Sequence, residues 1–337
     1  MLRAEIHCIE TYLPEKVLTN EELALEYAGW TASQIEQKTG IQSRHIAGES
    51  ECSSDMATAV GLKLFESGCI SPEEIDYVLL CTQSPDYFLP TTACLVQDRL
   101  GLRTNCGALD FNLGCSGFVY GLGLAKGLIE TEQAKNVLLI TAETYSKFIH
   151  PGDKSVRTVF GDAAAATLIR AVQSDREKIG PFVWGTDGRG AKNLIVPTGG
   201  LRSPHVAEAE ITEDGSGNKR TINNLYMNGA EIFTFTLRAV PEAVNKLLVK
   251  SGKTIEGIDL FLFHQANRFM LDHLKRKLSI PDDKLPLKMD HCGNTVSSTI
   301  PILLKDLADS GKISKGQCLM LLGFGVGYSW AGSIVNW

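Results

Sequence analysis

The feature that most constrains this fold is an internal repeat with an offset of about 180 residues. Three pairs of segments match in the same order along the chain: 59–68 with 243–252, 75–83 with 258–265, and 114–116 with 293–295. Their offsets, 243 − 59 = 184, 258 − 75 = 183 and 293 − 114 = 179, are nearly constant. Chance similarity between common α/β patterns is the alternative explanation. Order and spacing agree together, however, which favours a duplication.

Short apolar runs alternate with longer periodic segments in both halves. The runs expected to form buried strands are Val78–Leu80, Val137–Ile140, Phe261–Phe263 and Leu319–Leu322. The segments expected to form helices are Met56–Phe65, Phe118–Ile129, Ile232–Lys250, Phe269–Leu278 and Ile300–Leu307. This alternation is typical of an α/β fold. The sequence therefore predicts two similar halves, residues 1–175 and 176–337, with the polar segment 205–224 as a surface loop or flap.

Charge and cysteine content argue against several classes of protein. The net charge is −6 and no basic block occurs, so we expect no nucleic acid partner. Segment 1–16 lacks a basic stretch followed by an apolar core, and no apolar run is long enough to cross a bilayer. We therefore expect a cytoplasmic protein without a membrane partner. Nine cysteines, an odd number without a C-x-x-C pair, predict reduced thiols.

Segment 112–117 (NLGCSG) distinguishes Cys115 from the other cysteines. A strand-like run, 108–112, leads into this residue, and a helix is expected directly after it. The flanking glycines allow a tight turn and close approach of a substrate to the sulfur. The positive end of a helix dipole can lower a thiol pKa from about 8.5 to roughly 3.5–7.5. We therefore predict an activated nucleophile, although a glycine-flanked cysteine is more often structural.

Two further motifs contain polar side chains at the ends of apolar runs. Segment 262–267 (LFHQAN) carries His264, which is either an acid–base group or a buried core histidine. Segment 290–298 carries Asn294, which the repeat places in the position equivalent to Cys115. A helix N-cap is the alternative role for this asparagine. If the halves pack about a pseudo-twofold axis, the three residues converge at the seam.

Segment 323–327 (GFGVG) follows a buried strand. A dinucleotide-binding motif does not fit, because no G-x-G-x-x-G opens a helix here. Backbone N–H groups facing an oxyanion fit better. His291 and Cys292 have no further ligands at a useful spacing. We therefore expect neither a metal nor a cofactor.

Together these motifs resemble the thiolase-fold condensing enzymes, and most closely the β-ketoacyl-acyl-carrier-protein synthase III family. The resemblance runs nearly from end to end. It is carried by Thr39–Ile41, Arg44–Ile46, the Cys115 segment, Phe160–Ala163, His264–Asn267, Gly293–Thr295 and the terminal GFGVG. It implies a thiolase-like fold, in which two duplicated α/β halves form a five-layered αβαβα structure. It also implies a homodimer.

The resemblance implies a catalytic triad of Cys115, His264 and Asn294. In that family the cysteine takes an acyl group from a thioester of coenzyme A or of a carrier protein. A malonyl thioester on acyl carrier protein then loses CO₂, and its enolate attacks the acyl-enzyme. His264 and Asn294 would donate hydrogen bonds to the thioester oxygen where charge develops. The backbone N–H groups of Cys115 and Val326 would form the oxyanion hole.

Substrate and carrier residues are also implied by the resemblance. Leu89 and Phe160 would shape the acyl pocket, with Leu89 reaching across the dimer. The residues expected to receive the acidic acyl carrier protein are Arg268, Lys275, Arg276 and Lys277. An ordinary solvated helix face is the alternative for this cluster. Gln34 stands where the family commonly has a tryptophan that stacks on coenzyme A, so the donor stays open between coenzyme A and a carrier protein.

Four functions are compatible with these residues to different degrees. A decarboxylative condensing enzyme comes first. An acyltransferase of the same family, which passes the cysteine-bound acyl group to an oxygen or nitrogen nucleophile, is the alternative. A cysteine hydrolase would need a group that raises the basicity of the histidine. A non-catalytic scaffold is disfavoured, because Cys115, His264 and Asn294 are all present.

Overall fold

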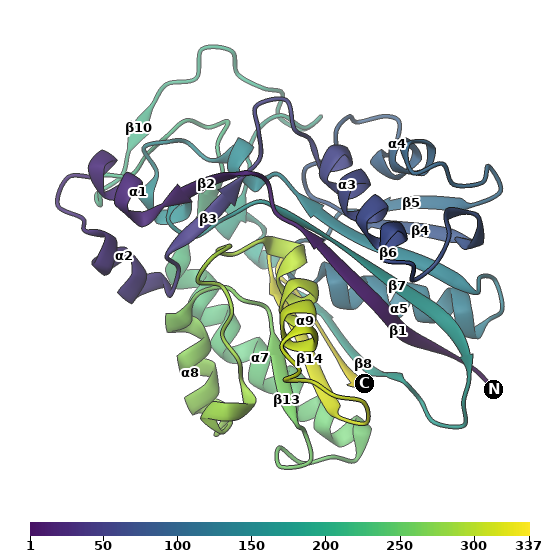
Figure 1. Cartoon of the computed structure of the whole chain (residues 1–337). Helices are drawn as coiled ribbons and strands as arrows, with labels where there is room; N and C mark the ends of the chain where they lie inside the picture. Colours follow the sequence, from purple (N-terminus) through teal and green to yellow (C-terminus); the bar gives the residue numbers. More distant parts are fainter.

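The structure is a computed structural model that describes all 337 residues, and its centre consists of two β-sheets (Figure 1). The five-stranded sheet contains, in order, β1 (Leu2–Tyr12), β7 (Ala163–Gln173), β6 (Asn136–Glu143), β4 (Tyr77–Cys81) and β5 (Gly107–Phe111). The four-stranded sheet contains, in order, β13 (Leu260–Phe263), β14 (Cys318–Gly325), β15 (Ser329–Asn336) and β8 (Ile179–Thr186). All four strands expected from the apolar runs are present, each extended by one or more residues.

The two sheets share one pairing pattern. In the first, β4 is parallel to β6, and β7 and β1 follow as antiparallel neighbours. In the second, β13 is parallel to β14, and β15 and β8 follow as antiparallel neighbours. Only the counterpart of β5 is missing from the second sheet. The predicted duplication is therefore confirmed in the strand order. The boundary predicted between residues 175 and 176 stays a prediction.

Helices complete five layers, as the resemblance implied. The middle layer consists of α5 (Gly117–Glu130) and α9 (Thr299–Asp309), which contact strands of both sheets. The outer face of the first sheet is covered by α3 (Ser53–Glu66) and α4 (Thr92–Arg99). The outer face of the second is covered by α7 (Gly229–Ser251), and α8 (Arg268–Leu278) packs beside α7. The five predicted helices all form, with ends that shift by a few residues.

The middle helices are apolar because they lie between two sheets. In α9, the residues Ile300–Leu304 are buried without interruption, so this helix has no wide polar face. One hydrophobic cluster includes side chains from both middle helices and from strands of both sheets. Each middle helix therefore packs against side chains from both halves of the protein.

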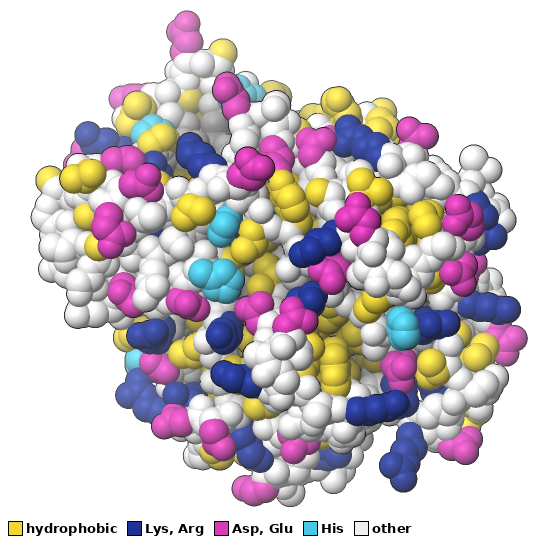
Figure 2. Space-filling view, in the orientation of Figure 1, with side chains coloured by type: hydrophobic (Ala, Val, Ile, Leu, Met, Phe, Trp, Pro, Cys, Tyr) yellow, Lys and Arg dark blue, Asp and Glu magenta, His cyan; other side chains and the backbone are white.

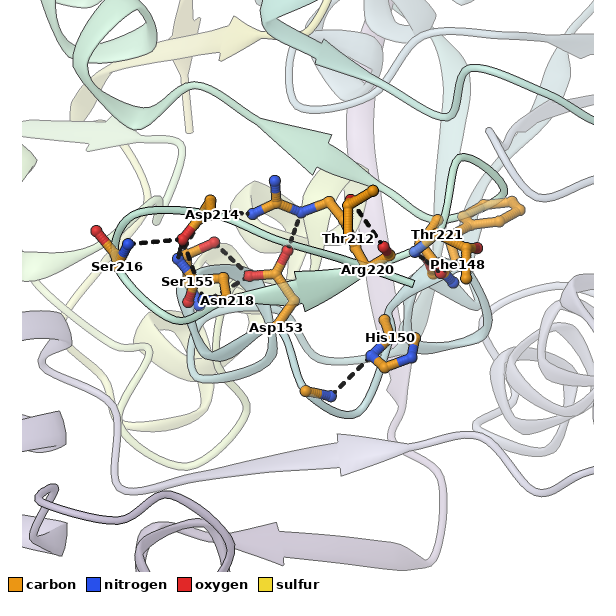
Figure 3. Close-up of polar contacts among 12 residues, drawn as sticks. Phe148, His150, Asp153, Ser155, Thr212, Asp214, Ser216, Asn218, Arg220 and Thr221 are labelled. Carbon is orange, nitrogen blue, oxygen red and sulfur yellow. Dashed lines mark hydrogen bonds and ion pairs between the residues drawn. The ribbon is translucent and has the colours of Figure 1, made fainter. Parts of the chain in front are cut away.

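Smaller elements surround this centre. They are β2 (Lys16–Thr19), α1 (Asn20–Glu26), α2 (Ala32–Thr39), β3 (Ser43–Ile46), α6 (Lys154–Arg157), β9 (Leu194–Ile195), β10 (Thr212–Glu213), β11 (Lys219–Arg220) and β12 (Tyr226–Met227). The predicted surface loop 205–224 contains the β10–β11 hairpin. Arg220 anchors this hairpin by bridging the buried Asp153 (2.7 Å) and Asp214 (2.8 Å), as Figure 3 shows. No helix is both long and apolar enough to cross a membrane.

Candidate active site

Cys115 lies in the tight connection between β5 and α5, with only 5% of its surface exposed. The thiol of Cys81 donates a hydrogen bond to the carbonyl of Leu113 (2.7 Å) and holds the connection from behind. Gly325 at the end of β14 faces the sulfur so closely that a Cβ there would lie 2.9 Å from Sγ of Cys115. The GFG segment thus contacts the predicted nucleophile directly.

His264 reaches the same place from β13. Its backbone N–H donates to the carbonyl of Leu322 (2.9 Å), which fixes it beside β14. Its ring meets Phe324 edge-on, with a centroid separation of 5.5 Å. Because Phe324 precedes the glycine that faces Cys115, adjacent residues of one strand contact the imidazole and the thiol.

Asn294 completes the cluster. Its backbone N–H donates to the carbonyl of Val159 (2.9 Å), and its side-chain Nδ2 lies 3.5 Å from Nε2 of His264. The amide orientation follows from a second contact, in which Oδ1 accepts the N–H of Val296 (2.9 Å). The Nδ2 group is therefore available as a donor. Asn294 therefore faces His264 directly, while His264 and Cys115 meet two adjacent residues of β14, Phe324 and Gly325.

Burial controls the protonation of both titratable groups. It raises the pKa of the Cys115 thiol to about 12, with a further contribution from the nearby Glu143 carboxyl, while the backbone N–H groups of Cys115 and Val326 act in the opposite direction. The lowered thiol pKa expected from the helix N-terminus is therefore wrong, because desolvation of the thiolate outweighs those dipoles. Burial also lowers the pKa of His264 to about 3, which keeps the imidazole neutral.

Glu143 is a buried carboxyl that the sequence interpretation missed. It ends β6, and its oxygens accept hydrogen bonds from the hydroxyl of Ser297 (2.7 Å) and the backbone N–H of Gln83 (2.9 Å). Complete burial raises the pKa of this carboxyl to about 8. Through the hydrogen bond from Ser297, Glu143 links the segment after Asn294 to the first half of the chain. An acidic residue at the end of an apolar run is the signal that could have identified it.

We expect the substitution Glu143→Gln to stabilise the protein at alkaline pH. The folded-state pKa is raised above the unfolded value, so wild-type stability is full below about pH 4.3 and is lost as the pH rises to about 8. The loss reaches roughly 5 kcal/mol once the carboxyl is ionised. Glutamine is uncharged and can keep both hydrogen bonds, by accepting from Gln83 and donating to Ser297.

The measurement is the thermal midpoint of wild type and variant from pH 5 to pH 9. The thermal midpoint of Glu143→Gln minus that of wild type should increase as the pH rises. The same difference for the exposed Glu66→Gln change should stay constant with pH. A difference between wild type and Glu143→Gln that is constant with pH would contradict the burial argument.

A cavity of about 810 Å³ opens beside Val326. Most of its other walls are apolar, and they include Phe88, Tyr145, Phe148, Leu194, Ile195 and Leu225. Tyr145 donates its hydroxyl proton to Oε1 of Gln83 (2.8 Å), and the Phe160 ring packs behind Tyr145 at 5.2 Å. Phe160 therefore supports the cavity from behind. Leu89 is 85% exposed and does not line the cavity of its own chain, so its contact across a dimer stays a prediction.

The predicted carrier residues lie on α8, which begins four residues after His264. Lys and Arg side chains gather at the lower left of Figure 2, where Figure 1 places this helix. Arg276 and Lys277 are exposed. Lys275 is paired with Asp272 (3.4 Å) and Asp282 (2.7 Å), so part of its charge is compensated.

The N-terminal helices contain a second feature that the sequence interpretation missed. Gln34 caps α2, because it exchanges hydrogen bonds with Thr31. Trp30 is half-buried, and two ammonium groups lie over its ring. The Nζ of Lys38 is 4.4 Å from the ring centroid, and the Nζ of Lys154 is 5.9 Å from it. An aromatic face beside two ammonium groups suits a phosphorylated aromatic ligand. Only the three-dimensional proximity of residues 30, 38 and 154 reveals it.

No group of three or more His, Cys, Asp or Glu side chains lies close enough together to hold a metal ion.

Known proteins are similar to this chain in sequence and in fold. The model of the 3-oxoacyl-[acyl-carrier-protein] synthase III family matches residues 109–188, and its C-terminal model matches residues 248–337. The β-ketoacyl-[acyl-carrier-protein] synthase III of Caldanaerobacter subterraneus is 36% identical, over 97% of this chain and 96% of its own. The protein of that name from Clostridioides difficile is 37% identical, over 99% and 98%. A crystal structure of a 3-oxoacyl-(acyl-carrier-protein) synthase III is 56% identical over 99% of this chain and 100% of its own, with a TM-score of 0.98. The chain therefore belongs to the 3-oxoacyl-[acyl-carrier-protein] synthase III family.

Proposed function

We propose that this protein is a condensing enzyme that carries an acyl group on Cys115. In the first step, the thiol displaces the thiol of an acyl thioester, and its proton ends on the departing sulfur. In the second, a malonyl thioester on acyl carrier protein loses CO₂. The resulting enolate attacks the acyl carbonyl, and the sulfur of Cys115 leaves as a thiolate that takes up a proton from solvent. The product is a 3-oxoacyl thioester on the carrier.

The contact between His264 and Asn294, two side chains that can donate hydrogen bonds without carrying a charge, is the observation that carries this proposal. A general base works best with a pKa near the operating pH, and burial lowers the pKa of this imidazole to about 3. A neutral imidazole is instead a suitable hydrogen-bond donor to a developing enolate oxygen. The decarboxylation itself needs no base. The full-length relatives are named β-ketoacyl synthases, which favours condensation over acyl transfer and over hydrolysis.

The remaining roles follow from the contacts around Cys115. The backbone N–H groups of Cys115 and Val326 both act on the sulfur. They are therefore suited to stabilise the oxyanion that forms when the attached thioester is attacked. The side chains of His264 and Asn294 would donate the second pair of hydrogen bonds, to the carbonyl oxygen of the malonyl thioester.

Substrates and assembly belong to the same proposal. The 810 Å³ cavity would hold the acyl chain, since most of its lining is apolar. Trp30 with Lys38 and Lys154 would hold the nucleotide of a coenzyme A donor. The exposed Tyr87, Phe88 and Leu89 side chains support a homodimer. The cytoplasmic location stays a prediction.

The function is tested by offering the protein a panel of acyl-coenzyme A and acyl-carrier thioesters and recording intact mass. Malonyl-acyl carrier protein is then added, and CO₂ and 3-oxoacyl product are assayed. We expect an acyl adduct followed by stoichiometric CO₂ and product. An adduct without CO₂ would favour the acyltransferase alternative. Absence of an adduct with every donor would remove the covalent mechanism.

Charge reversal on α8 tests the carrier surface. Opposite charges steer carrier and enzyme together, so we expect Arg276→Glu with Lys277→Glu to raise KM for the carrier-linked substrate about tenfold. The rate with a small malonyl thioester analogue should be unchanged. The matched control is Lys312→Glu with Lys315→Glu, two exposed lysines beyond the far end of α9. Equal losses with both substrates, or with both double variants, would argue against docking on α8.

A further inference from the structure

His264 is held through the ring nitrogen that faces away from Asn294. Its Nδ1 lies 2.7 Å from Oγ1 of Thr299, and both side chains are buried. Thr299 is the first residue of α9, so the middle layer of the fold fixes its position. A neutral imidazole carries one proton, on Nδ1 or on Nε2, and the partner of Nδ1 decides which.

The other ring nitrogen faces an amide whose direction is fixed. Because Oδ1 of Asn294 is occupied by the N–H of Val296, the Nδ2 group points toward Nε2 of His264 at 3.5 Å. This distance is at the long limit of an N–H hydrogen bond. At this separation both nitrogens can carry protons that are directed at one common acceptor.

The hydroxyl of Thr299 has one proton and two acceptors in reach. The carbonyl of Val296 lies 3.2 Å away, and Nδ1 of His264 lies at 2.7 Å. Donation to Nδ1 uses the shorter of the two contacts and leaves the proton of the imidazole on Nε2, facing Asn294. We propose that Thr299 is a positioning residue that keeps the proton of His264 on Nε2. The Nε2–H and the Nδ2–H of Asn294 then form a two-donor site for the oxygen of the malonyl thioester.

This inference rests on the proposed condensing function, and it separates the two half-reactions. Acyl loading on Cys115 does not use the two-donor site, whereas decarboxylation does. Thr299→Val keeps the shape of the side chain and removes its hydroxyl. We expect this change to lower the rate of CO₂ release about 10- to 100-fold, as loss of a supporting hydrogen bond does elsewhere, and to leave acyl loading unchanged.

Two variants complete the comparison. Thr299→Ser retains the hydroxyl and should restore most of the CO₂ release. Thr167→Val is the matched control, because Thr167 is also buried but its hydroxyl has no hydrogen-bond partner. It should leave both half-reactions at the wild-type rate. Equal losses of loading and CO₂ release in Thr299→Val would indicate a merely structural role and overturn the inference, as would an unchanged rate of CO₂ release.

The tautomer itself is measured by NMR of ¹⁵N-histidine-labelled protein, in which only seven histidines contribute. The signals of His264 are assigned by their loss in His264→Gln. We expect the Nε2–H tautomer in wild type and Thr299→Ser, and loss of that preference in Thr299→Val. A wild-type ring protonated on Nδ1 would overturn the inference even if Thr299→Val does not fold. Failure of the proposed function would instead appear as a wild type without a Cys115 adduct, and the NMR result would still decide the tautomer.

Discussion

Replacing Cys115 by alanine is expected to abolish the acyl adduct and to lower product formation by at least three orders of magnitude. The sulfur is the atom that would carry the acyl group between the two half-reactions, and alanine offers no nucleophile in its place. The measurement is intact mass after incubation with the donor that labels wild type best, followed by the CO₂ and product assays.

The protein should fold normally, because Cys115 contributes a small apolar side chain to a large cluster. Cys94 is exposed and provides the matched control, since Cys94→Ala should keep both adduct and product. An adduct of unchanged yield in Cys115→Ala would move the nucleophile to another of the nine cysteines. The central assignment of the site would then be wrong.

The second large effect is expected for Asn294→Ala, which should separate the two half-reactions. The change removes one of two donors to the enolate oxygen, and loss of one such donor typically lowers the rate about 10²- to 10³-fold. CO₂ release should fall by that factor, while the adduct on Cys115 should still form at a rate near that of wild type. The measurement compares the single-turnover rate of loading with the rate of CO₂ release.

An exposed asparagine on α7 provides the control, because Asn245→Ala removes the same amide away from the site. It should leave both rates unchanged. Since Asn294 also accepts the N–H of Val296, its loss could disturb the local backbone. Parallel losses in loading and CO₂ release would point to that disturbance and would argue against a role confined to condensation.

Residues close together in sequence were the ones that sequence reasoning identified. Cys115 was found because glycines, a strand and a helix adjoin it along the chain. Asn294 was found because the repeat made it the counterpart of Cys115, and His264 because an apolar run ends at it. Their meeting at one seam was predicted from the duplication, and the contacts along β14 agree with it.

Residues that act through distant partners were missed. Glu143 and Ser297 are 154 positions apart, and Thr299 meets His264 across 35 positions. Trp30 and Lys154, whose Nζ lies 5.9 Å from the centroid of the indole ring, are 124 positions apart (154 − 30 = 124). Local patterns do not identify the partners in such contacts, because each partner alone is an ordinary strand end, helix start or loop residue.

For Cys115 alone, some properties follow from the sequence and others only from the tertiary structure. Its place at a helix N-terminus, its glycine neighbours and its equivalence to Asn294 follow from the order of residues along the chain. The direction of its pKa shift does not, because desolvation depends on how completely both sheets and both middle helices enclose the sulfur. The sequence by itself thus determined the duplicated fold and pointed to Cys115 as the candidate nucleophile. Only the tertiary structure decided the protonation of the thiol and the imidazole, since burial and charge proximity arise when distant segments pack together.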